Sequence, residues 1–179
     1  MIVKRGKVGK YLSKLVKEMR LVMYPYTAIN LKEKSSNNMR DFLSLVDIYG
    51  YSHMITFTNT DKNSYMHLAK MPKGPTISFK INDFILASDI FANNTQCPLI
   101  KDFSHTPLMV MTGFNNEKIA EEYKTAITTT SMLFTSFFPP CDLSSINMKK
   151  YKRVVLINLN IIDNIPQIEL RYYKINIEK

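Results

Sequence analysis

The sequence predicts an α+β fold in a single domain, residues 1–179, and three observations support this. A chain of 179 residues suits one domain, which we divide into halves of about residues 1–82 and 83–179. Apolar residues recur at helical spacing in some segments, and short runs rich in β-branched and aromatic residues lie between turn residues in others. Both kinds of segment occur in each half, so we expect helices mixed with a mostly antiparallel sheet.

Two helices are predicted in the first fifty residues. The first has apolar residues in steps of three and four along one face: Val8, Leu12, Leu15 and Met19. It should end near residue 24, because Pro25 disfavours helical geometry in the residue before it, and 25–31 should be extended. The second helix is predicted over 39–50, with Ser36 or Asn37 as candidate N-caps.

Six strands and two further helices are expected in the rest of the chain. The strand segments are bounded by turn residues: 53–60, 64–71, 77–81, 108–114, 152–161 and 167–175. Residues 83–92 are compatible with a helix, and 117–138 with a longer one whose centre, TTTS, has weak helix propensity. The last two strands should form a hairpin around IDNIP.

Positive charge is concentrated in the first quarter of the chain. The formal net charge is +9, from 24 Lys and Arg against 15 Asp and Glu. Residues 1–40 contain ten of these bases and two of the acids, which gives +8; the remaining fourteen bases and thirteen acids give +1. A concentrated basic region is expected of a protein that binds a polyanion, and a solubilising surface is the alternative.

Other functional classes are disfavoured. Cys97 and Cys141 form no C-x-x-C pair and the three histidines are scattered, so neither a disulfide framework nor a metal site is expected. No run of eighteen apolar residues and no apolar signal core is present. Local motifs suggest no catalytic group. We expect a reduced, intracellular protein with no cofactor, no small-molecule substrate and no membrane partner.

The stretch GKVGKYLSKLVKEMR, residues 6–20, places a lysine after each of two glycines. A P-loop needs four residues between its glycines and a hydroxyl residue after its lysine; here two residues separate Gly6 from Gly9, and Tyr11 follows Lys10. No buried strand long enough to seat such a loop is predicted before it, so nucleotide hydrolysis is disfavoured. Membrane binding is disfavoured because the core needs the apolar face. A helix that contacts nucleic-acid phosphates is the preferred interpretation.

Several segments, in order, resemble one protein family. They are RGKVGKYLSKLVKEMRLVMYPYTAINLKEKSSNNMRDFL, KGPTISF, TPLMVMTGF, TTSMLFTSFFPPCDLSSINMKKYKRVVLINLN and IELRYYKI. Together they make the chain similar to Brix-domain proteins of ribosome biogenesis, and within these to the Peter Pan / Ssf group. The resemblance implies two similar α/β halves related to the anticodon-binding domain of class IIa aminoacyl-tRNA synthetases.

The resemblance also implies a function. It implies a non-enzymatic assembly factor of the nucleus and nucleolus that binds the ribosomal RNA precursor during rRNA processing and maturation of the large ribosomal subunit. Its protein partners would be large-subunit assembly factors in pre-ribosomal particles. Three alternatives stay open: another RNA-binding module, for tRNA or small-subunit pre-rRNA; a protein-interaction adaptor within pre-ribosomes; and an RNA-processing enzyme.

The predicted RNA contacts come from several regions. The N-terminal quarter contributes ten bases: Lys4, Arg5, Lys7, Lys10, Lys14, Lys17, Arg20, Lys32, Lys34 and Arg40. The cluster KKYKR contributes Lys149, Lys150, Tyr151, Lys152 and Arg153, and its tyrosine is suited to stacking on an unpaired base. Lys73 and Arg171 complete the set. The alternatives are a solvated charged surface for the lysines and a structural ion pair for Arg171.

The family's signature turn is Gly74, Pro75 and Thr76. Pro75 fixes φ and Gly74 permits a sharp turn, so setting the strand register explains this motif at least as well as RNA contact does.

Overall fold

The structure is a computed structural model that describes residues 1–34, 37–92, 103, 105–116, 119–139 and 151–175. The chain divides into two compact units, Met1–Cys97 and Pro98–Lys179. Residues 83–92 therefore belong to the first unit, where the backbone N–H of Ala87 donates to Glu18 Oε2 at 2.9 Å. No helix in the described ranges has the length and apolar character needed to cross a bilayer.

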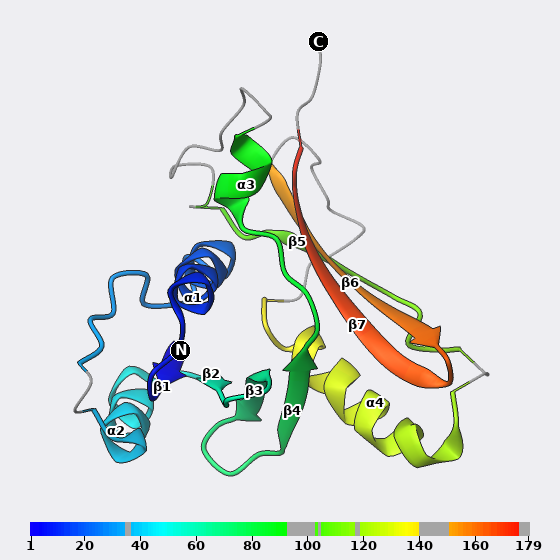
Figure 1. Cartoon of the computed structure of the whole chain (residues 1–179), viewed down its shortest axis with the longest axis horizontal. Coiled ribbons are helices and arrows are strands. Elements are labelled where there is room, and N and C mark those ends of the chain that lie inside the picture. Colours follow the sequence, from blue (N-terminus) through cyan, green and yellow to red (C-terminus); the bar gives the residue numbers. More distant parts are fainter. Residues whose placement is uncertain (35–36, 93–102, 104, 117–118, 140–150, 176–179) are drawn as a thin grey trace. The chain divides into compact units, whose positions relative to one another are not determined.

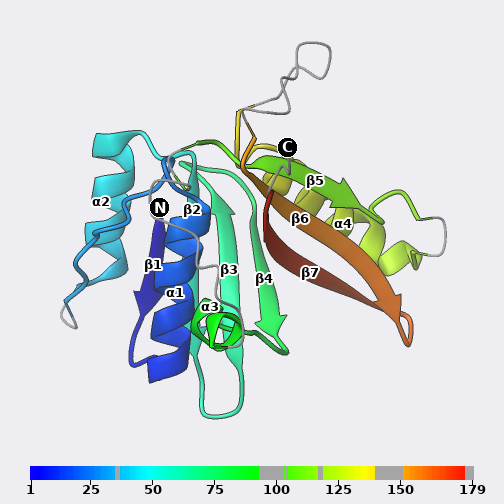
Figure 2. The same ribbon diagram turned by 90° about the horizontal axis from the view of Figure 1, so that it is seen from above.

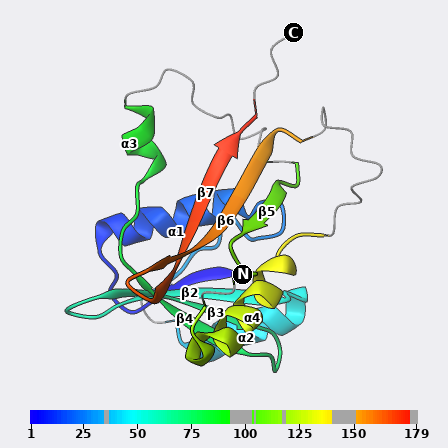
Figure 3. The ribbon, with the colours of Figure 1, turned by 90° about the vertical axis from the view of Figure 1, so that its right-hand side faces the viewer.

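The first unit is a four-stranded mixed sheet with helices on both faces (Figure 1). Its strands lie in the order β1 (Ile2–Arg5), β2 (His53–Asn59), β3 (Ser64–Lys70) and β4 (Thr76–Ile81). β1 runs parallel to β2, and the other two pairs are antiparallel. Figures 1 and 3 show α1 (Lys10–Val22) and α2 (Met39–Tyr49) on opposite faces of this sheet. The short α3 (Ala87–Phe91) follows β4.

Strand β1 was not predicted, and its presence corrects the analysis of the glycine stretch. Ile2 and Val3 are 2% and 0% exposed, so a buried strand does lead into the Gly6–Gly9 loop. The strand has only four residues, too few for an alternating pattern to be recognised.

Alternating side chains of this sheet supply two apolar layers. Met1, Val3 and Met54 face α2 and pack with its Phe42 and Val46. The side chains that alternate with them, including Ile55, Phe57 and Leu68, point to the opposite face, on which α1 lies. Helix α1 buries an apolar stripe of its own: Leu12, Val16 and Met19.

The predicted helices of this unit form, with differences at their ends. α1 and α2 lie within the predicted segments, but α2 is capped by Asn38, whose N–H donates to Asp41 Oδ2 at 2.8 Å. Neither predicted cap has that place: Asn37 lies one residue earlier, and Ser36 is outside the described residues. Residues 25–31 form turns and not an extended piece. α3 occupies only five residues of the predicted helix at 83–92.

The second unit is a three-stranded sheet in the order β5 (Leu108–Thr112), β6 (Arg153–Ile162) and β7 (Ile165–Lys174). Helix α4 (Glu121–Thr135), shorter than the predicted 117–138, lies along one face of it (Figure 2). Ile127 of α4 packs with Ile119 and with Leu159 of β6. The predicted last hairpin is confirmed; Asp163 and Asn164 form its turn with φ values of 52° and 63°, as a type I′ turn requires.

The two units share an arrangement of three strands. In each, a strand leads through a helical connection to a parallel neighbour, which is followed by an antiparallel strand: β1–α1–α2–β2–β3 in the first unit and β5–α4–β6–β7 in the second. Each first strand ends at a glycine with positive φ, 72° at Gly6 and 82° at Gly113. The sheets are thus mixed, with a parallel pair in each that the sequence did not reveal.

Candidate nucleic-acid interface

Four of the predicted lysines form an exposed stripe along α1. Lys10, Lys14 and Lys17 follow one another in steps of four and three, which places them on one side of the helix, and Lys7 lies in the loop before it. Within the described part of the chain, none of these four lysines takes part in an ion pair. We call Lys7, Lys10, Lys14 and Lys17 the α1 lysine stripe. Because no carboxylate of the described residues pairs with these lysines, the stripe presents a positive surface there.

The start of α1 adds hydrogen-bond donors to this surface. Gly9 is the N-cap and offers no side chain, and both Gly6 and Gly9 are exposed. The first backbone N–H groups of a helix have no partner within it, and the helix dipole makes this end favourable for anions. Tyr11, 66% exposed, lies in the first turn beside Lys10.

Arg20, which we predicted as an RNA contact, is instead an internal structural residue. The residue is 4% exposed, and its donors reach the carbonyl oxygen of Ile2 at 2.9 and 3.0 Å and that of Leu31 at 3.0 Å. It also forms an ion pair of 2.6 Å with Glu33. The planar guanidinium has five donors in a fixed fork, and here they tie β1 to the segment after α1. Burial therefore removes Arg20 from the interface.

The prediction that Arg153 contacts RNA is corrected for the same reason. It is 0% exposed, and its guanidinium donates to the carbonyl oxygens of Phe103 at 2.9 Å and His105 at 2.8 Å. The guanidinium carbon also lies 5.4 Å from the centre of the Phe103 ring. Of the same predicted cluster, Lys152 is exposed and Tyr151 half-buried, whereas Lys149 and Lys150 lie outside the described residues.

The other predicted basic residues differ in their exposure and in their ion pairs. Lys4 is only partly exposed, and its Nζ lies 3.8 Å from Glu33 Oε2. Glu33 therefore forms ion pairs with both Lys4 and Arg20. Arg171 is exposed and pairs with Glu169 at 3.0 Å; hydrogen bonds to Tyr173 and Glu169 raise its pKa. The remaining bases are exposed: Arg5, Lys32, Lys34, Arg40 and Lys73.

The signature turn connects β3 to β4 and is packed tightly. A Cβ on Gly74 would overlap the Lys70 side chain and its carbonyl oxygen, to which the N–H of Gly74 donates at 2.9 Å. The N–H of Lys70 donates in turn to the carbonyl of Pro75 at 3.0 Å. These contacts account for the glycine as a structural requirement of the turn. Thr76, the first residue of β4, is exposed.

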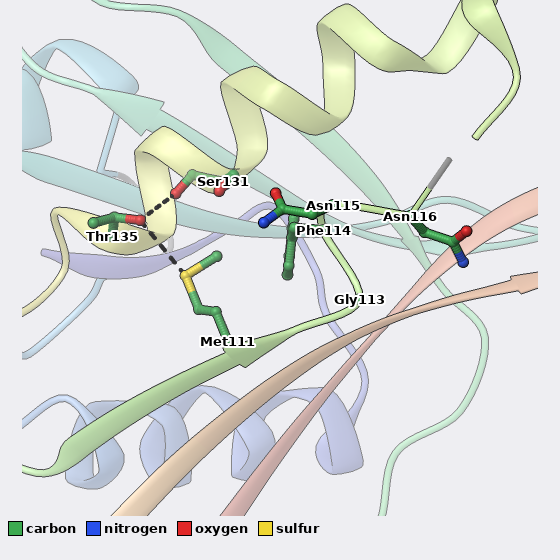
Figure 4. Close-up of a pocket in the computed structure, with 7 residues that line it drawn as sticks. All are labelled: Met111, Gly113, Phe114, Asn115, Asn116, Ser131 and Thr135. Atoms are coloured by element: carbon green, nitrogen blue, oxygen red, sulfur yellow. Dashed lines mark hydrogen bonds between the residues drawn. The ribbon is translucent and has the colours of Figure 1, made fainter. Parts of the chain in front are cut away.

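Two open cavities lie on the described surface. One, of about 360 Å³, lies in the first unit between the end of β1, α2 and the signature turn. The other, of about 480 Å³, lies where β5 ends and faces α4 (Figure 4). In the latter, Thr135 Oγ1 lies 3.6 Å from Met111 Sδ and 2.8 Å from the carbonyl oxygen of Ser131. None of its lining residues is charged, so it offers no cation for a phosphate.

The sequence analysis missed a polar cluster across the first sheet. His67 contacts Thr58 Oγ1 through Nε2 at 2.9 Å and Ser78 Oγ through Nδ1 at 2.7 Å. The alternation in SYMHLAK, which places Tyr65 and His67 on one face of a predicted strand, was a signal for it. Since hydroxyls occupy both ring nitrogens, no carboxylate orients the imidazole as in a hydrolytic triad.

His53 is a buried titratable residue whose pKa is shifted. Burial, together with the charges of Lys70 and the N-terminal amine, lowers the pKa of His53 to about 4. No group of three or more potential metal ligands occurs among the described residues.

Comparison with known proteins identifies the family. The Brix domain family matches residues 6–179. The chain belongs to the Brix family. A Brix domain-containing protein of Schizosaccharomyces pombe is 33% identical over 162 residues, which cover 88% of this Brix chain and 41% of that protein. A Peter Pan-like protein of Arabidopsis thaliana is 31% identical over 178 residues, 99% of this chain and 49% of that protein.

A third relative carries a functional name. Ribosome biogenesis protein SSF1 of Saccharomyces cerevisiae is 32% identical over 175 residues, 94% of this Brix chain and 38% of that protein. The resemblance to the Peter Pan / Ssf group is therefore confirmed. The Brix chain spans less than half the length of each of these three relatives.

Proposed function

We propose that this Brix protein is a non-enzymatic ribosome assembly factor that binds the ribosomal RNA precursor while the large subunit matures. The names Peter Pan and ribosome biogenesis protein SSF1 among its relatives support a role in ribosome biogenesis, and with it a nuclear and nucleolar location. The single observation that carries RNA binding is the α1 lysine stripe, four exposed cations with no ion-pair partner in the described chain.

Binding through this stripe is electrostatic. Each lysine that neutralises a phosphate releases a counterion, so affinity falls steeply with salt and depends little on sequence. If six or more phosphates are engaged in total, affinity should fall by about a thousandfold or more between 50 and 200 mM salt. The family resemblance also implies a relation to the anticodon-binding domain of class IIa synthetases, which makes RNA the more reasonable ligand.

The test compares two triple variants with equal charge change. Lys10/Lys14/Lys17→Ala removes the helical part of the stripe, and Lys62/Lys124/Lys174→Ala removes three exposed lysines elsewhere. Binding of a labelled large-subunit precursor fragment is measured across a salt series. We expect the stripe variant to bind more weakly, with a slope of log K against log salt shallower by roughly two to three, and the control to match wild type. Equal binding by both variants contradicts the proposal, and preference for a tRNA or a small-subunit fragment redirects it.

A protein partner is a second candidate function, which an apolar surface favours. Ile85, Ile90 and Phe84, around α3, are 73%, 47% and 38% exposed. Single exposed apolar residues are common, but neighbouring ones often mark a contact surface. We propose that a large-subunit assembly factor docks here. Ile85→Asp should then weaken incorporation into pre-ribosomal particles while affinity for isolated RNA is unchanged; unchanged incorporation argues against this surface.

A further inference from the structure

We propose that the cavity in the first unit holds an unpaired nucleotide of the bound RNA, with its base against the open face of the first sheet. This inference rests on the proposed RNA binding and adds a contact of different chemistry, because the α1 lysine stripe recognises only phosphate. The relatives' names point to no base-binding position, and Tyr151, which the sequence analysis considered for base stacking, does not line this cavity.

Strand register brings polar and aromatic side chains together on this face. Directly opposed residues share a face, and the pairing aligns Arg5, Thr58, Tyr65 and Lys80 in one row across all four strands. The next row contains Thr56, His67 and Ser78. Arg5, Ser78 and Lys80 are exposed, and Tyr65 and His67 are half-buried, so this part of the face is open to solvent.

The cavity has a polar floor and an apolar wall. Its floor is made by Thr56, Thr58 and His67, and Arg5 lies at its rim. The wall comes from Met39 and Leu43 of α2. The volume of about 360 Å³ lies within the range of small-ligand sites. A planar base needs these features: an apolar surface to cover one face, and donors and acceptors along its edge.

The imidazole of His67 is held in place within this floor. Contacts of 2.9 Å to Thr58 and 2.7 Å to Ser78 fix its ring from both sides. The Tyr65 ring lies 6.3 Å away, centre to centre, and is inclined by only 22°, so the two rings present similarly oriented faces. Ordered aromatic faces on a sheet are suited to stacking on unstacked bases.

Charge and continuity favour RNA as the occupant. The charged residues that line the cavity are Arg5 and Lys70, and no carboxylate lines it. Arg5 ends β1 and only Gly6 separates it from Lys7, so positive groups continue from the cavity rim into the α1 lysine stripe. A single strand can therefore place phosphates along α1, pass the end of β1 and insert a base on the other face of the sheet.

The experiment uses the full chain and a short single-stranded RNA that carries the fluorescent base 2-aminopurine. Ala69→Leu fills the cavity without removing a polar group, since Ala69 lies in its lining. Tyr65→Leu removes one ring, and Tyr173→Leu, at a 46% exposed tyrosine of the second unit, is the matched control. We expect Ala69→Leu and Tyr65→Leu to weaken single-strand binding about five- to a hundredfold and to abolish the fluorescence change. Their salt slope should stay as in wild type, because no cation is removed.

The outcomes separate this inference from the proposed function. Weaker single-strand binding by Ala69→Leu, at the cavity, and by Tyr65→Leu, beside His67, with unchanged affinity for duplex RNA of the same sequence, supports the inference. Wild-type binding in both, while the stripe variant binds weakly, overturns it and leaves the proposed function intact. If no variant differs from wild type, the stripe and the cavity are both excluded as RNA contacts. Circular dichroism of each variant shows whether it is folded.

Discussion

At the scale of residues, the basic side chains of this protein have two roles that their positions in the sequence do not distinguish. Lys17 and Arg20 are one turn apart on α1, yet Lys17 is exposed and Arg20 is 4% exposed. Arg20 can be internal because carbonyl oxygens and Glu33 accept its donors. Arg153 is internal on the same principle. Burial of an arginine is tolerated only where such acceptors exist.

The first prediction concerns Arg20. Arg20→Ala should lower the free energy of unfolding by roughly 3–5 kcal/mol. It removes the donors of the Ile2 and Leu31 carbonyl oxygens and leaves the buried Glu33 carboxylate with Lys4 alone. Lys17→Ala on the same helix should change it by less than about 0.5 kcal/mol. Urea denaturation followed by circular dichroism measures both. An Arg20→Ala variant as stable as wild type but defective in RNA binding would restore the original assignment of Arg20 to the interface.

The second prediction concerns His53 and pH. Its pKa is about 4 in the folded chain and 6.5 in an unfolded one, so between these values the unfolded chain binds a proton that the folded chain excludes. Neutral His53 therefore contributes up to about 3 kcal/mol to the free energy of unfolding above pH 6.5, and this contribution is lost as pH falls towards 4. His53→Gln should show a correspondingly smaller loss from pH 7 to 4.5 in urea titrations. Parallel pH profiles for the two proteins would contradict this.

Part of the candidate site could be predicted from residue types and spacing. The α1 lysine stripe followed from lysines at helical intervals, and the structure places them on one exposed side. The burial of Arg20 could not be predicted, because its acceptor Ile2 lies in a strand too short to recognise. The cavity could not be predicted either, because it depends on the register of Thr58 and His67 in separate strands. Register is a tertiary property that local patterns leave undetermined.

At the scale of elements, patterns of local origin were predicted well, and pairings between strands distant in the sequence were not. Helices α1 and α2 and the β6–β7 hairpin follow from periodicity, capping and turn residues near in sequence. The parallel pairs β1·β2 and β5·β6 join strands separated by a helical connection, so no turn residue marks them. The predicted helix extended past the C-terminus of α4, because apolar residues continue after Thr135 with the buried Phe137 and Phe138.

The third prediction compares the glycines that end β1 and β5. Both have positive φ, so alanine costs about 1–2 kcal/mol at either position. A Cβ at Gly6 meets nothing within 4 Å, whereas at Gly113 it overlaps the carbonyl oxygen of Leu159 in the neighbouring strand. In denaturant titrations, Gly113→Ala should therefore lower the free energy of unfolding by roughly 1–3 kcal/mol more than Gly6→Ala does. Equal losses would show that β5 shifts relative to β6 without cost.

At the scale of the whole molecule, charge is distributed unevenly along a chain with two similar units. Residues 1–40 contribute +8 of the net +9, and all of them lie in the first unit. The second unit has a parallel pair of strands followed by an antiparallel strand as well, but its helix α4 begins with Glu121 and Glu122, whereas α1 begins with Lys10. Acidic residues stabilise a helix start and repel phosphate there. The start of α1 in the first unit is therefore basic and attracts a polyanion, whereas the start of α4 in the second unit is acidic and repels it.

The fourth prediction tests this asymmetry across the whole chain. Bound RNA should shield lysines of the α1 lysine stripe from an amine-acylating reagent, because an ammonium group held against phosphate and covered by RNA reacts slowly. Lys62, Lys124 and Lys174, exposed elsewhere, should react at nearly the same rate with and without RNA. Mass spectrometry of the modified chain measures every lysine in one experiment, and we expect severalfold protection confined to residues 7–17 and their neighbours in the first unit. Protection centred instead on Lys152 and Lys174 would place the RNA on the second unit, and uniform protection would indicate charge attraction without a defined surface.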